Sequence, residues 1–590
     1  MLKEAIYHRP KGNYAYAYDG NTLHLRLRTK KDDVEQATVI WDDPFNGEVK
    51  EEGWVWIPQE STPMEKCGST ELYDYWFTSL EPEHKRLKYA FELQNSNETI
   101  YYTEKGFYTE KSSSFPGFFT FPYLLEEDVF QAPEWVKDTV WYQIFPERFA
   151  NGNPDNNPPG ALGWGEAEPA GDNFFGGDFE GIIHYLDHLE DLGVTGIYLT
   201  PIFKAHSNHK YDTVDYFMID PQFGDKKKFK ELVEKCHARG IKVMLDAVFN
   251  HCGFYFPPFQ DVLEKGSKSA YVDWFFIQDF PLQTEPRPNY STFGYESKMP
   301  KLNTANQEVR NYLLEVGRYW VKEFDIDGWR LDVSNEVSHE FWRVFRNEVK
   351  KIKPDLYILG EIWHDALPWL GGDQFDAVMN YPYTGPAIEY FAERSISTET
   401  FVYQTTEALM MYPKTVTKAA FNLLGSHDTP RIASICNENK DKVRLLFAFL
   451  LSSPGTPCIY YGDEIGMSGG MDPGCRKCME WDPAKQDQDL FAFIKQLIQL
   501  RKEYKAIGSE GEFQFINFDN KEQKLLYKKS YQNETILFFI NNSSESVQFE
   551  VPNKYKNLQG ADLLAETLAW KDLRESIFVE SYSIKVIKIQ

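Results

Sequence analysis

The sequence lacks the features that would point to a membrane, a nucleic acid or a disulfide-rich fold. No window of its 590 residues approaches the ~18 unbroken apolar residues of a membrane span, and residues 1–10 contain no apolar core of signal-peptide length. Lysine and arginine (63) are outnumbered by aspartate and glutamate (89), and the formal net charge of −26 argues against a nucleic acid or an anionic membrane as partner. The seven cysteines are odd in number and scattered, unlike a disulfide framework. We therefore expect a soluble, cytoplasmic protein with reduced thiols.

Two of the cysteines, Cys475 and Cys478, have the spacing of half a zinc site or of a redox pair. No second Cys/His pair lies nearby in the sequence, and no thioredoxin-like strand–helix–strand pattern surrounds them. We favour an ordinary loop over metal or redox chemistry here.

The length predicts three or four domains. Residues 1–125 contain short alternating runs such as Leu23–Arg28 and Trp54–Ile57, which are typical of a β-sandwich. The stretch Ser112–Gly117 and the prolines at 122 and 133 indicate a linker zone. Alternating runs return near the end, for example at Thr535–Ile540, and predict a second β-sandwich over 506–590.

Between these two regions, residues 126–505 alternate strand and helix patterns. Eight strands can be placed, and they open near Val140, Gly196, Ile241, Ile326, Leu356, Ala377, Ala420 and Cys458. That count and rhythm predict a closed parallel (β/α)₈ barrel. The gap between the third and fourth strands, about residues 250–310, is too long for an ordinary loop.

Four of the predicted strands stop at a carboxylate or an imidazole. The segments are Met244–His251, Gly328–Asp332, Ile358–Ile362 and Asn422–Asp428. In a barrel of this kind the carboxyl ends of the strands carry the chemistry. A single acid at a strand end could be only a turn former or a helix cap, but four such ends in one barrel favour an active site.

These segments resemble those of the α-amylase family of retaining α-glycoside hydrolases, in the same order and with the same residue types. A fifth segment, Met299–Asn303, and the run Glu361–His364 are similar to the branch with neopullulanase, cyclomaltodextrinase and maltogenic amylase. The resemblance implies a TIM barrel with a small inserted domain at about 250–310 that walls the substrate cleft, flanked by N-terminal and C-terminal β-sandwiches.

The resemblance also implies catalytic roles. Asp332 matches the nucleophile, Glu361 the acid/base, and Asp428 a third carboxylate that grips the 2- and 3-hydroxyls of the sugar. Retention requires nucleophile and acid about 5–5.5 Å apart. Arg330 lies two residues before Asp332 and so on the same side of the strand, where it would keep Asp332 ionised; a purely structural ion pair is the alternative. Asp246 matches a structural acid that orients Arg330.

Further positions match substrate-binding residues of this branch. They are His209, Tyr211, His251, Phe293, Arg330, Trp363, His427, Asp472 and Arg476. Tyr211 would stack under the scissile glucose, and Asp472 with Arg476 would fix the non-reducing end. For the last two, a simple loop salt bridge is an equal alternative. For the suggested acceptor-side residues Trp363 and Phe293, a place in the core is nearly as well supported.

The resemblance implies one cofactor, a structural Ca²⁺ ion. The matching residues are Asn151, Asn153, Asn156, Asn157, Gly176 and Asp178. Calcium prefers six to eight oxygen ligands, many of them carboxylates. Because Asn153 and Asn157 replace acids found in relatives, we expect weak binding. The alternative is a plain turn cluster of asparagine, glycine and proline.

The function expected from these matches is hydrolysis of α-1,4 bonds in cyclodextrins, pullulan and maltooligosaccharides. Transglycosylation is a second outcome of the same intermediate, so a glucanotransferase or isomerase stays open. A non-catalytic carbohydrate-binding relative is a remote alternative, because such relatives lack the nucleophile or the acid. The branch resemblance also implies a homodimer that forms through the N-terminal domain.

Overall fold

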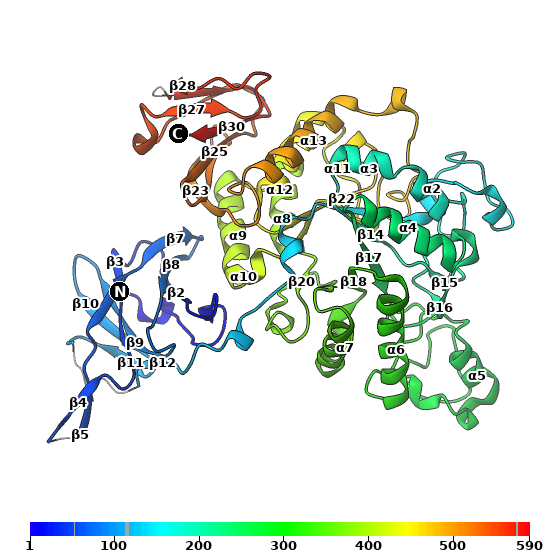
Figure 1. Cartoon of the computed structure of the whole chain (residues 1–590), viewed down its shortest axis with the longest axis horizontal. Coiled ribbons are helices and arrows are strands. Elements are labelled where there is room, and N and C mark those ends of the chain that lie inside the picture. The colour runs from blue at the N-terminus through cyan, green and yellow to red at the C-terminus, as the bar shows by residue number, and fades with distance from the viewer. Residues whose placement is uncertain (52, 112–116, 574–575) are drawn as a thin grey trace. The chain divides into compact units, whose positions relative to one another are not determined.

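The computed structural model describes residues 1–51, 53–111, 117–573 and 576–590. Most of the expected linker stretch, residues 112–116, lies outside the described residues. The chain divides into two compact units, whose elements are labelled in Figure 1. The first unit is Met1–Gln131, Ile396–Thr417 and Gln514–Lys528, and the second is Ala132–Ser395, Lys418–Phe513 and Lys529–Gln590. In the described part of the chain no helix is long and apolar enough to cross a membrane.

The second unit contains the predicted barrel of eight parallel strands. The strands are β13 (Trp141–Ile144), β14 (Gly196–Leu199), β17 (Lys242–Ala247), β18 (Gly328–Leu331), β19 (Tyr357–Gly360), β20 (Ala377–Val378), β21 (Phe421–Leu423) and β22 (Thr456–Tyr460). Their order in the sheet is β20-β19-β18-β17-β14-β13-β22-β21, and a parallel bridge between Met379 and Phe421 joins the two ends. The barrel is therefore closed, and all eight predicted strands are confirmed.

Large side chains fill the interior of the barrel. Trp141, Tyr198, Met244, Tyr357 and Phe421 are all fully buried in one cluster, and the rings of Trp141 and Tyr357 stack with centroids 5.8 Å apart. The strands are apolar along both faces because the interior packing lies on one side and the helices on the other. The polar residues within the strands that matter for the site, such as Asp246 and Arg330, lie toward their carboxyl ends.

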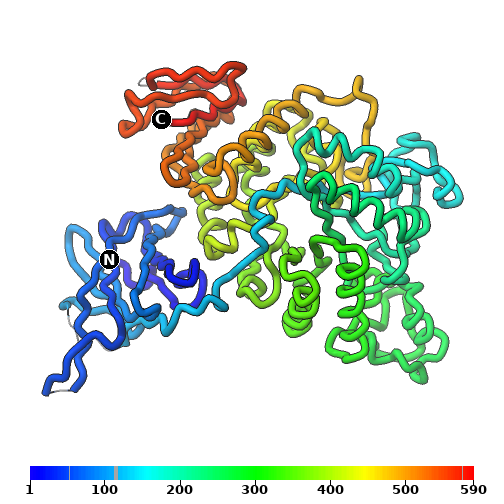
Figure 2. The backbone as a smooth tube through the Cα atoms, in the orientation of Figure 1, coloured from blue at the N-terminus to red at the C-terminus, as the bar shows by residue number. Residues whose placement is uncertain are grey.

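Helices connect the strands and surround them, as Figure 2 lets the reader follow along the chain. The longest are α4 (Lys226–Ala238), α6 (Gln307–Phe324), α7 (His339–Ile352), α12 (Lys440–Ser452) and α13 (Gln488–Glu503). Side-chain caps mark the starts of several of them: Asp225 accepts the N–H of Lys228 at α4, and Asn306 accepts those of Glu308 and Val309 at α6. These caps fix where the chain leaves each loop for a helix.

The long segment between β17 and β18 folds as helix α5 (Pro257–Lys265) followed by short turns and single bridges, until α6 begins at Gln307. One bridge pairs Thr292 with Pro300 and another pairs His251 with Lys301. The turn between residues 292 and 300 is thereby held next to the end of β17.

The first unit is built on two antiparallel sheets. One sheet has the order β1-β2-β8-β7 and the other β11-β10-β9-β3-β6, with β12 also paired to β9. Their bounds are β1 (Ala15–Ala17), β2 (Leu23–Lys30), β3 (Gln36–Asp42), β6 (Glu60–Pro63), β7 (Glu65–Ser69), β8 (Tyr73–Leu80), β9 (Leu87–Gln94), β10 (Thr99–Thr103), β11 (Gly106–Tyr108) and β12 (Phe119–Phe121). The inward residues of the sheets share one buried cluster that includes Leu25, Val39 and Phe91, which confirms the expected N-terminal β-domain.

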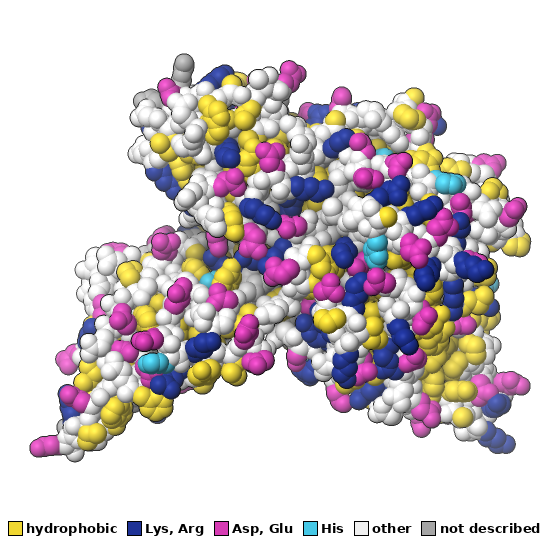
Figure 3. Space-filling model, in the orientation of Figure 1, with side chains coloured by type: hydrophobic (Ala, Val, Ile, Leu, Met, Phe, Trp, Pro, Cys, Tyr) yellow, Lys and Arg dark blue, Asp and Glu magenta, His cyan; other side chains and the backbone are white. Residues whose placement is uncertain are grey.

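The end of the chain is also β-structure, as predicted. In the second unit β25 (Glu534–Asn541) pairs with β30 (Ser583–Ile589), β30 pairs with β27 (Gln559–Asp562), and β26 (Val547–Glu550) pairs with β29 (Ser576–Val579). The preceding strands β23 (Glu512–Asp519) and β24 (Lys524–Tyr531) contribute most of their residues to the first unit. On the face shown in Figure 3, acidic and basic side chains are interspersed.

Candidate active site

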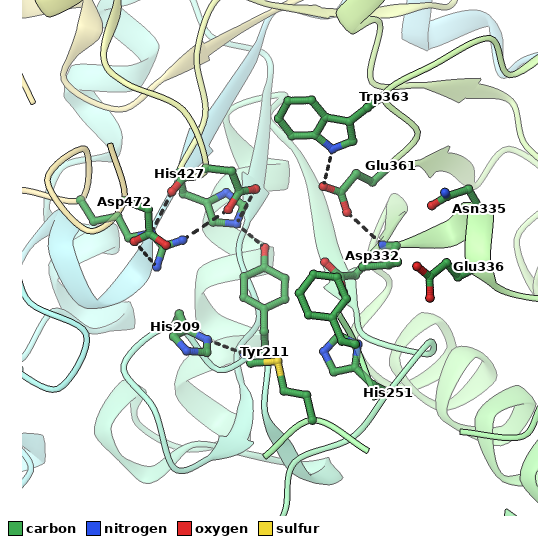
Figure 4. A pocket seen from close by; sticks show the side chains of 15 residues that line it. His209, Tyr211, His251, Asp332, Asn335, Glu336, Glu361, Trp363, His427 and Asp472 are labelled. Atoms are coloured by element: carbon green, nitrogen blue, oxygen red, sulfur yellow. Dashed lines mark hydrogen bonds and ion pairs between the residues drawn. The ribbon is translucent and has the colours of Figure 1, made fainter. Parts of the chain in front are cut away.

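A pocket of about 440 Å³ lies at the carboxyl ends of the barrel strands. Its lining residues, shown as sticks in Figure 4, are His209, Tyr211, His251, Phe293, Met299, Asp332, Val333, Asn335, Glu336, Glu361, Trp363, His427, Asp428, Asp472 and Arg476. Eleven of these fifteen are residues that the sequence had marked as catalytic or substrate-binding. The two remaining candidates, Arg330 and Asp246, lie directly behind the wall of the pocket.

One buried guanidinium joins carboxylates from three neighbouring strands. Arg330 on β18 places Nη1 2.8 Å from Asp332 Oδ1 and 2.9 Å from Asp246 Oδ2, and places Nη2 2.9 Å from Glu361 Oε2. Arg330 and Asp246 are fully buried, and the carboxyl groups of Asp332 and Glu361 are almost so. The predicted Arg330–Asp332 pair is therefore present, as part of a larger cluster that also includes Asp246 and Glu361.

Arg330 favours the ionised form of Asp332, as the sequence led us to expect, but it acts against burial and against the neighbouring carboxylates. Burial raises the pKa of Asp332 well above its usual range, because Arg330 only partly offsets the loss of water and Glu361 adds repulsion. Burial likewise raises the pKa of Asp246 to about 6 against the pull of Arg330. One cation thus faces three buried carboxylates, so the protonation of Asp332 and Asp246 depends on the other members of the cluster.

The carboxyl groups of Asp332 and Glu361 have different hydrogen-bond environments. Asp332 Oδ1 faces Arg330, whereas Oδ2 is buried without a hydrogen-bond partner among the described residues. Glu361 accepts hydrogen bonds on both oxygens, from Val333 N to Oε2 (2.9 Å) and from Trp363 Nε1 to Oε1 (3.1 Å). Buried carboxylate oxygens are usually paired, so Asp332 Oδ2 is an unsatisfied acceptor in the pocket wall.

Val333, the residue after Asp332, has a strained backbone conformation. Its φ of 44° lies in the left-handed region, which is costly for a β-branched residue. The backbone N–H that this turn presents is the one that binds Glu361. Strain of this kind is characteristic of functional sites, where the surrounding structure imposes it.

Tyr211 and His427 form a rigid floor beside the acids. Their rings are parallel, with centroids 5.3 Å apart, and Tyr211 Oη lies 2.6 Å from His427 Nε2 and 2.9 Å from Asp246 Oδ2. Burial lowers the pKa of His427 well below its usual range, so the ring is neutral. Because Gln143 Nε2 donates to its Nδ1 (2.7 Å), Nε2 carries the proton and donates toward Tyr211.

Two further imidazoles line the pocket in their neutral form. Burial lowers the pKa of His209 to about 4 and that of His251 to about 3. His209 Nδ1 accepts the backbone N–H of Tyr211 (3.1 Å). His251 Nε2 is buried with no hydrogen-bond partner in the described part of the chain, while Phe293 stacks on its ring with centroids 5.1 Å apart. His251 can therefore offer Nε2 to a ligand hydroxyl.

Arg476 ties the third carboxylate to a neighbouring loop. Its Nη2 lies 3.3 Å from Asp428 Oδ1, its Nη1 lies 2.9 Å from Asp472 Oδ1, and its Nε donates to the carbonyl of His427 (2.8 Å). The sequence left open whether Asp472 and Arg476 form only a loop salt bridge. They do form the bridge, and both also line the pocket.

Trp363 and Phe293 are not core residues. Their exposed fractions are 49% and 39%, and both face the pocket. The ring of Trp363 stacks on Tyr381 with centroids 3.7 Å apart and an angle of 6°. The core alternative for these two aromatics is wrong, because Trp363 follows the end of β19 and Phe293 lies in the long segment between β17 and β18, both facing the pocket.

Several residues of the site were not among those predicted from the sequence. Met299, Val333, Asn335 and Glu336 line the pocket, and Tyr198 Oη donates to Asp246 from behind (2.6 Å). Met299 opens the segment that carried the branch resemblance, and Asn335 and Glu336 follow directly after the end of β18, so position alone could have indicated them. Tyr198 lies within β14 and matches no motif in the sequence, so nothing in the sequence indicated its contact with Asp246.

The asparagine-rich loop after β13 brings part of the predicted calcium site together. Asn151 Nδ2 donates to Asn157 Oδ1 (2.9 Å), and Asn151 Oδ1 is buried without a hydrogen-bond partner among the described residues. A Cβ on Gly176 would lie 2.2 Å from Asn157 Oδ1, so the backbone passes directly over these amides. Buried amide oxygens of this kind fit a hard cation.

Asp178 is less available to a metal than the sequence suggested. Its carboxylate accepts the backbone N–H groups of Gly152 (3.0 Å), Asn153 (2.8 Å) and Gly181 (2.7 Å), the last as the cap of helix α2 (Phe179–His184). The side chain of Asn153 accepts from Asp155 N, and Asn156 belongs to the same turn. No group of three His, Cys, Asp or Glu side chains suited to a metal occurs in the described residues.

Comparison with known proteins supports the same reading along the whole chain. Residues 143–511 match the model of the α-amylase catalytic domain, residues 1–125 that of the α-amylase N-terminal Ig-like domain, and residues 513–586 that of the maltogenic amylase C-terminal domain.

Individual relatives agree. A maltogenic α-amylase from Bacillus acidopullulyticus is 58% identical over 93% of each chain, and neopullulanase 2 from Thermoactinomyces vulgaris is 46% identical over 94% of this chain and 93% of its own. The solved structure of a cyclomaltodextrinase superposes with a TM-score of 0.93 at 46% identity over 100% of both chains. This chain is an enzyme that belongs to the α-amylase family of glycoside hydrolases.

Proposed function

We propose that the enzyme cleaves α-1,4-glucosidic bonds with retention of configuration, with Asp332 as nucleophile and Glu361 as acid/base. One observation carries the proposal. Asp332 Oδ2 is an unpaired, buried carboxylate oxygen in the pocket wall, while its partner oxygen is fixed by the same arginine that contacts Glu361. An unpaired oxygen aimed at a substrate is what a nucleophilic carboxylate requires.

The reaction has two displacements at the anomeric carbon. In the first, Glu361 gives its proton to the glycosidic oxygen, the bond from C1 to that oxygen breaks, and Asp332 Oδ2 bonds to C1. In the second, Glu361 takes a proton from water, the water oxygen bonds to C1, and Asp332 leaves. The first displacement therefore requires Asp332 in its ionised form and Glu361 in its protonated form.

The other pocket residues hold the sugar. Asp428 would accept hydrogen bonds from hydroxyls of the reacting ring as it flattens toward the oxocarbenium ion, which lowers the barrier because these bonds tighten in the transition state. His251 Nε2 supplies a hydrogen-bonding group to a neighbouring hydroxyl, and the neutral His427 holds the Tyr211 hydroxyl in place. Tyr211 provides the stacking face, and Asp472 with Arg476 close one end of the pocket.

The substrates proposed are cyclodextrins, pullulan and maltooligosaccharides. The support is the similarity to proteins named cyclomaltodextrinase, neopullulanase and maltogenic α-amylase. Separate incubation with β-cyclodextrin, pullulan and soluble starch tests this, with products followed by size and by anomer. The first reducing ends released should be α, and the Asp332→Asn variant should release none. A β-anomer in the earliest product would overturn the retaining mechanism.

Transfer to a sugar hydroxyl is a second outcome that one observation favours. Trp363 exposes half of its ring at the rim beside the acid, and an aromatic face there can hold an acceptor sugar. Water and a sugar then compete for the same intermediate. Adding glucose as acceptor at rising concentration should yield transfer products in proportion, whereas a pure hydrolase would yield none.

We propose further that a Ca²⁺ ion binds the loop of Asn151 and Asn157 and stabilises the barrel without joining the reaction. The support is the buried, unpaired Asn151 Oδ1 beside the close-packed Gly176. Asn153 and Asp178 already accept backbone N–H groups and would share their oxygens between these and the ion.

The proposed homodimer uses the first unit. In this unit Phe45, Val49 and Trp54 have exposed fractions of 70%, 80% and 54% and lie on or next to the hairpin of β4 (Gly47–Lys50) and β5 (Gly53–Trp56). Exposed apolar side chains that gather on one element are typical of an interface, and homo-oligomers are mostly twofold. Light scattering of the full chain should give a dimer, and the Trp54→Ser/Phe45→Asp double variant should give a monomer with a lower preference for cyclodextrin over starch.

A further inference from the structure

The two oxygens of Glu361 differ in their ability to carry a proton. Oε2 accepts the N–H of Val333 (2.9 Å) and lies 2.9 Å from Arg330 Nη2. A backbone N–H and a guanidinium are permanent donors, since neither loses its hydrogen at accessible pH. A proton on Oε2 would point at other hydrogens, so the proton that the acid step needs belongs on Oε1.

Oε1 faces a different donor. Trp363 Nε1, which can only donate, lies 3.1 Å from it, and Figure 4 shows the indole over the carboxyl group at the pocket wall. Stacking on Tyr381 at 3.7 Å and 6° fixes the direction of this N–H. Trp363 is thus the neutral side chain that contacts the oxygen expected to release the proton.

We propose that Trp363 is a positioning residue for proton donation by Glu361, in addition to any contact of its ring with sugar. The inference rests on the proposed function. As the proton moves from Oε1 to the glycosidic oxygen and the C1–O bond breaks, negative charge develops on Oε1 and the Trp363 hydrogen bond strengthens. A bond that tightens in the transition state lowers the barrier of this step. In the second displacement Oε1 regains a proton from water and the same bond weakens.

Other charged and titratable groups that act on Glu361 come from every strand end around it. They are Tyr198 on β14, Asp246 on β17, Arg330 and Asp332 at β18, Tyr381 on α8 (Tyr381–Ala387) and His427 after β21. Substitution of Trp363 leaves all of these in place. The removal of its N–H can therefore be tested against an otherwise unchanged set of charges.

The test compares wild type with Trp363→Phe, which keeps an aromatic ring but has no N–H. Substrates are two aryl α-maltosides of similar shape, one with a 2,4-dinitrophenol leaving group that needs no protonation and one with 4-methoxyphenol, which does. Loss of ring stacking would slow both alike. Loss of the donor should lower kcat/KM about tenfold more for the 4-methoxyphenyl substrate, so the ratio of the two constants isolates the acid step.

The pH profile supplies a second readout that a structural role would not move. Without the donor that favours ionised Glu361, the alkaline limb of kcat/KM should move to higher pH by about 0.5–1 unit. The matched control is Trp369→Phe, since Trp369 lies six residues later and its Nε1 has no hydrogen-bond partner among the described residues. It should change neither readout.

An unchanged ratio of the two maltosides together with an unmoved alkaline limb in Trp363→Phe would overturn the inference. Circular dichroism and the melting temperature of the same sample establish that this variant is folded, and an isosteric benzothienylalanine at position 363 repeats the test if phenylalanine disturbs the fold. Failure of the proposed function looks different, because wild type itself would then fail to hydrolyse the maltosides or Asp332→Asn would stay active.

Discussion

Two aspartates at opposite ends of the same barrel strand have opposite electrostatic environments. Asp327 immediately precedes β18 and Asp332 immediately follows it, and both are almost fully buried. Two lysines and an imidazole surround the carboxylate of Asp327: Lys353 Nζ lies at 2.9 Å, Lys242 Nζ at 3.0 Å and His237 Nε2 at 2.7 Å. Asp332 shares its one cation, Arg330, with two other carboxylates.

The consequences for protonation differ in sign. At Asp327 burial would raise the pKa, but His237, Lys353 and the N–H of Val243 outweigh it and hold the pKa well below its usual range. At Asp332 burial dominates and the pKa is raised. At the amino end of β18 the ionised Asp327 therefore stabilises the fold. At the carboxyl end the ionised form of Asp332 is disfavoured by its surroundings. Unfavourable environments of this kind are characteristic of catalytic groups.

The largest expected effect is on turnover in Asp332→Asn. An amide cannot form the glycosyl ester, so kcat should fall by about 10⁴-fold or more. The melting temperature should rise, because a carboxyl group whose pKa is raised by folding destabilises the folded state at neutral pH. This destabilisation grows as pH rises from about 4 toward the pKa of Asp332 in the folded protein. Steady-state rates and thermal scans of the same sample measure both effects.

A variant that lost activity and also melted earlier would show that Asp332 stabilises the fold, which would contradict the contrast between the two strand ends.

The same substitution at the other end, Asp327→Asn, should have the opposite signature. Removing the buried anion leaves Lys242 without this partner, while Lys353 keeps its ion pair with Asp325. The melting temperature should fall by about 5 °C, with kcat changed less than about twofold. The pKa of Asp327 is lowered in the fold, so its stabilisation is present above about pH 4 and is lost as pH falls further. The gap in melting temperature between wild type and variant should therefore shrink below that pH.

Equal gaps at pH 7 and pH 3 would mean that packing, and not charge, accounts for the effect of Asp327.

The barrel and the identity of its acids could be predicted from the sequence, because each depends on residues that are near in the chain. Apolar runs of strand length and the polar residue that ends each run are local patterns, and β18 with Arg330 and Asp332 is one such run. The environment of Asp332 could not be predicted, since Asp246 and Glu361 approach it from two other strands. The balance of burial against charge exists only after the strands have assembled.

The units of the chain were also only partly predictable. The N-terminal β-domain was expected, but not its inclusion of 396–417 and 514–528. Arg26 Nη1 donates to the carbonyl of Tyr412 (2.7 Å) and Asn13 Nδ2 to that of Met411 (3.1 Å). Side-chain bonds to backbone groups some 400 residues away leave no local pattern in a single sequence.

Calcium is expected to have a smaller effect, and one confined to stability. If the ion binds beside Asn151 and Asn157, EDTA should lower the melting temperature by a few degrees, about 2–4 °C, with the initial rate at 25 °C unchanged. Asn151→Ala should remove the response to EDTA because it deletes the buried unpaired oxygen. A wild-type protein whose melting temperature does not respond to EDTA, or to added calcium, would contradict the site.

The smallest expected effect concerns a third buried ionisable side chain, Lys529. Unlike Asp327 it has no side chain of opposite charge in an ion pair among the described residues, and unlike Asp332 it does not line the pocket. It is fully buried on β24, and its Nζ donates to the carbonyl of Gly508 (3.1 Å). Burial, reinforced by Arg501, lowers its pKa well below the usual range. A lowered lysine pKa costs stability at every pH below the unfolded value of about 10.4, and the cost is absent above that pH.

Lys529→Met should therefore raise the melting temperature at pH 7 by about 1–3 °C, an amount reduced by the hydrogen bond that Gly508 loses. The gain should vanish near pH 10.5, where wild-type lysine is neutral in both states. Thermal scans at the two pH values measure the difference, and activity serves as the control because Lys529 lies outside the pocket. A variant that melts earlier at pH 7 would show that the bond to Gly508 outweighs the cost of burial. Hydrogen bonding would then contribute more to the free energy of unfolding at this position than the charge of the buried side chain does.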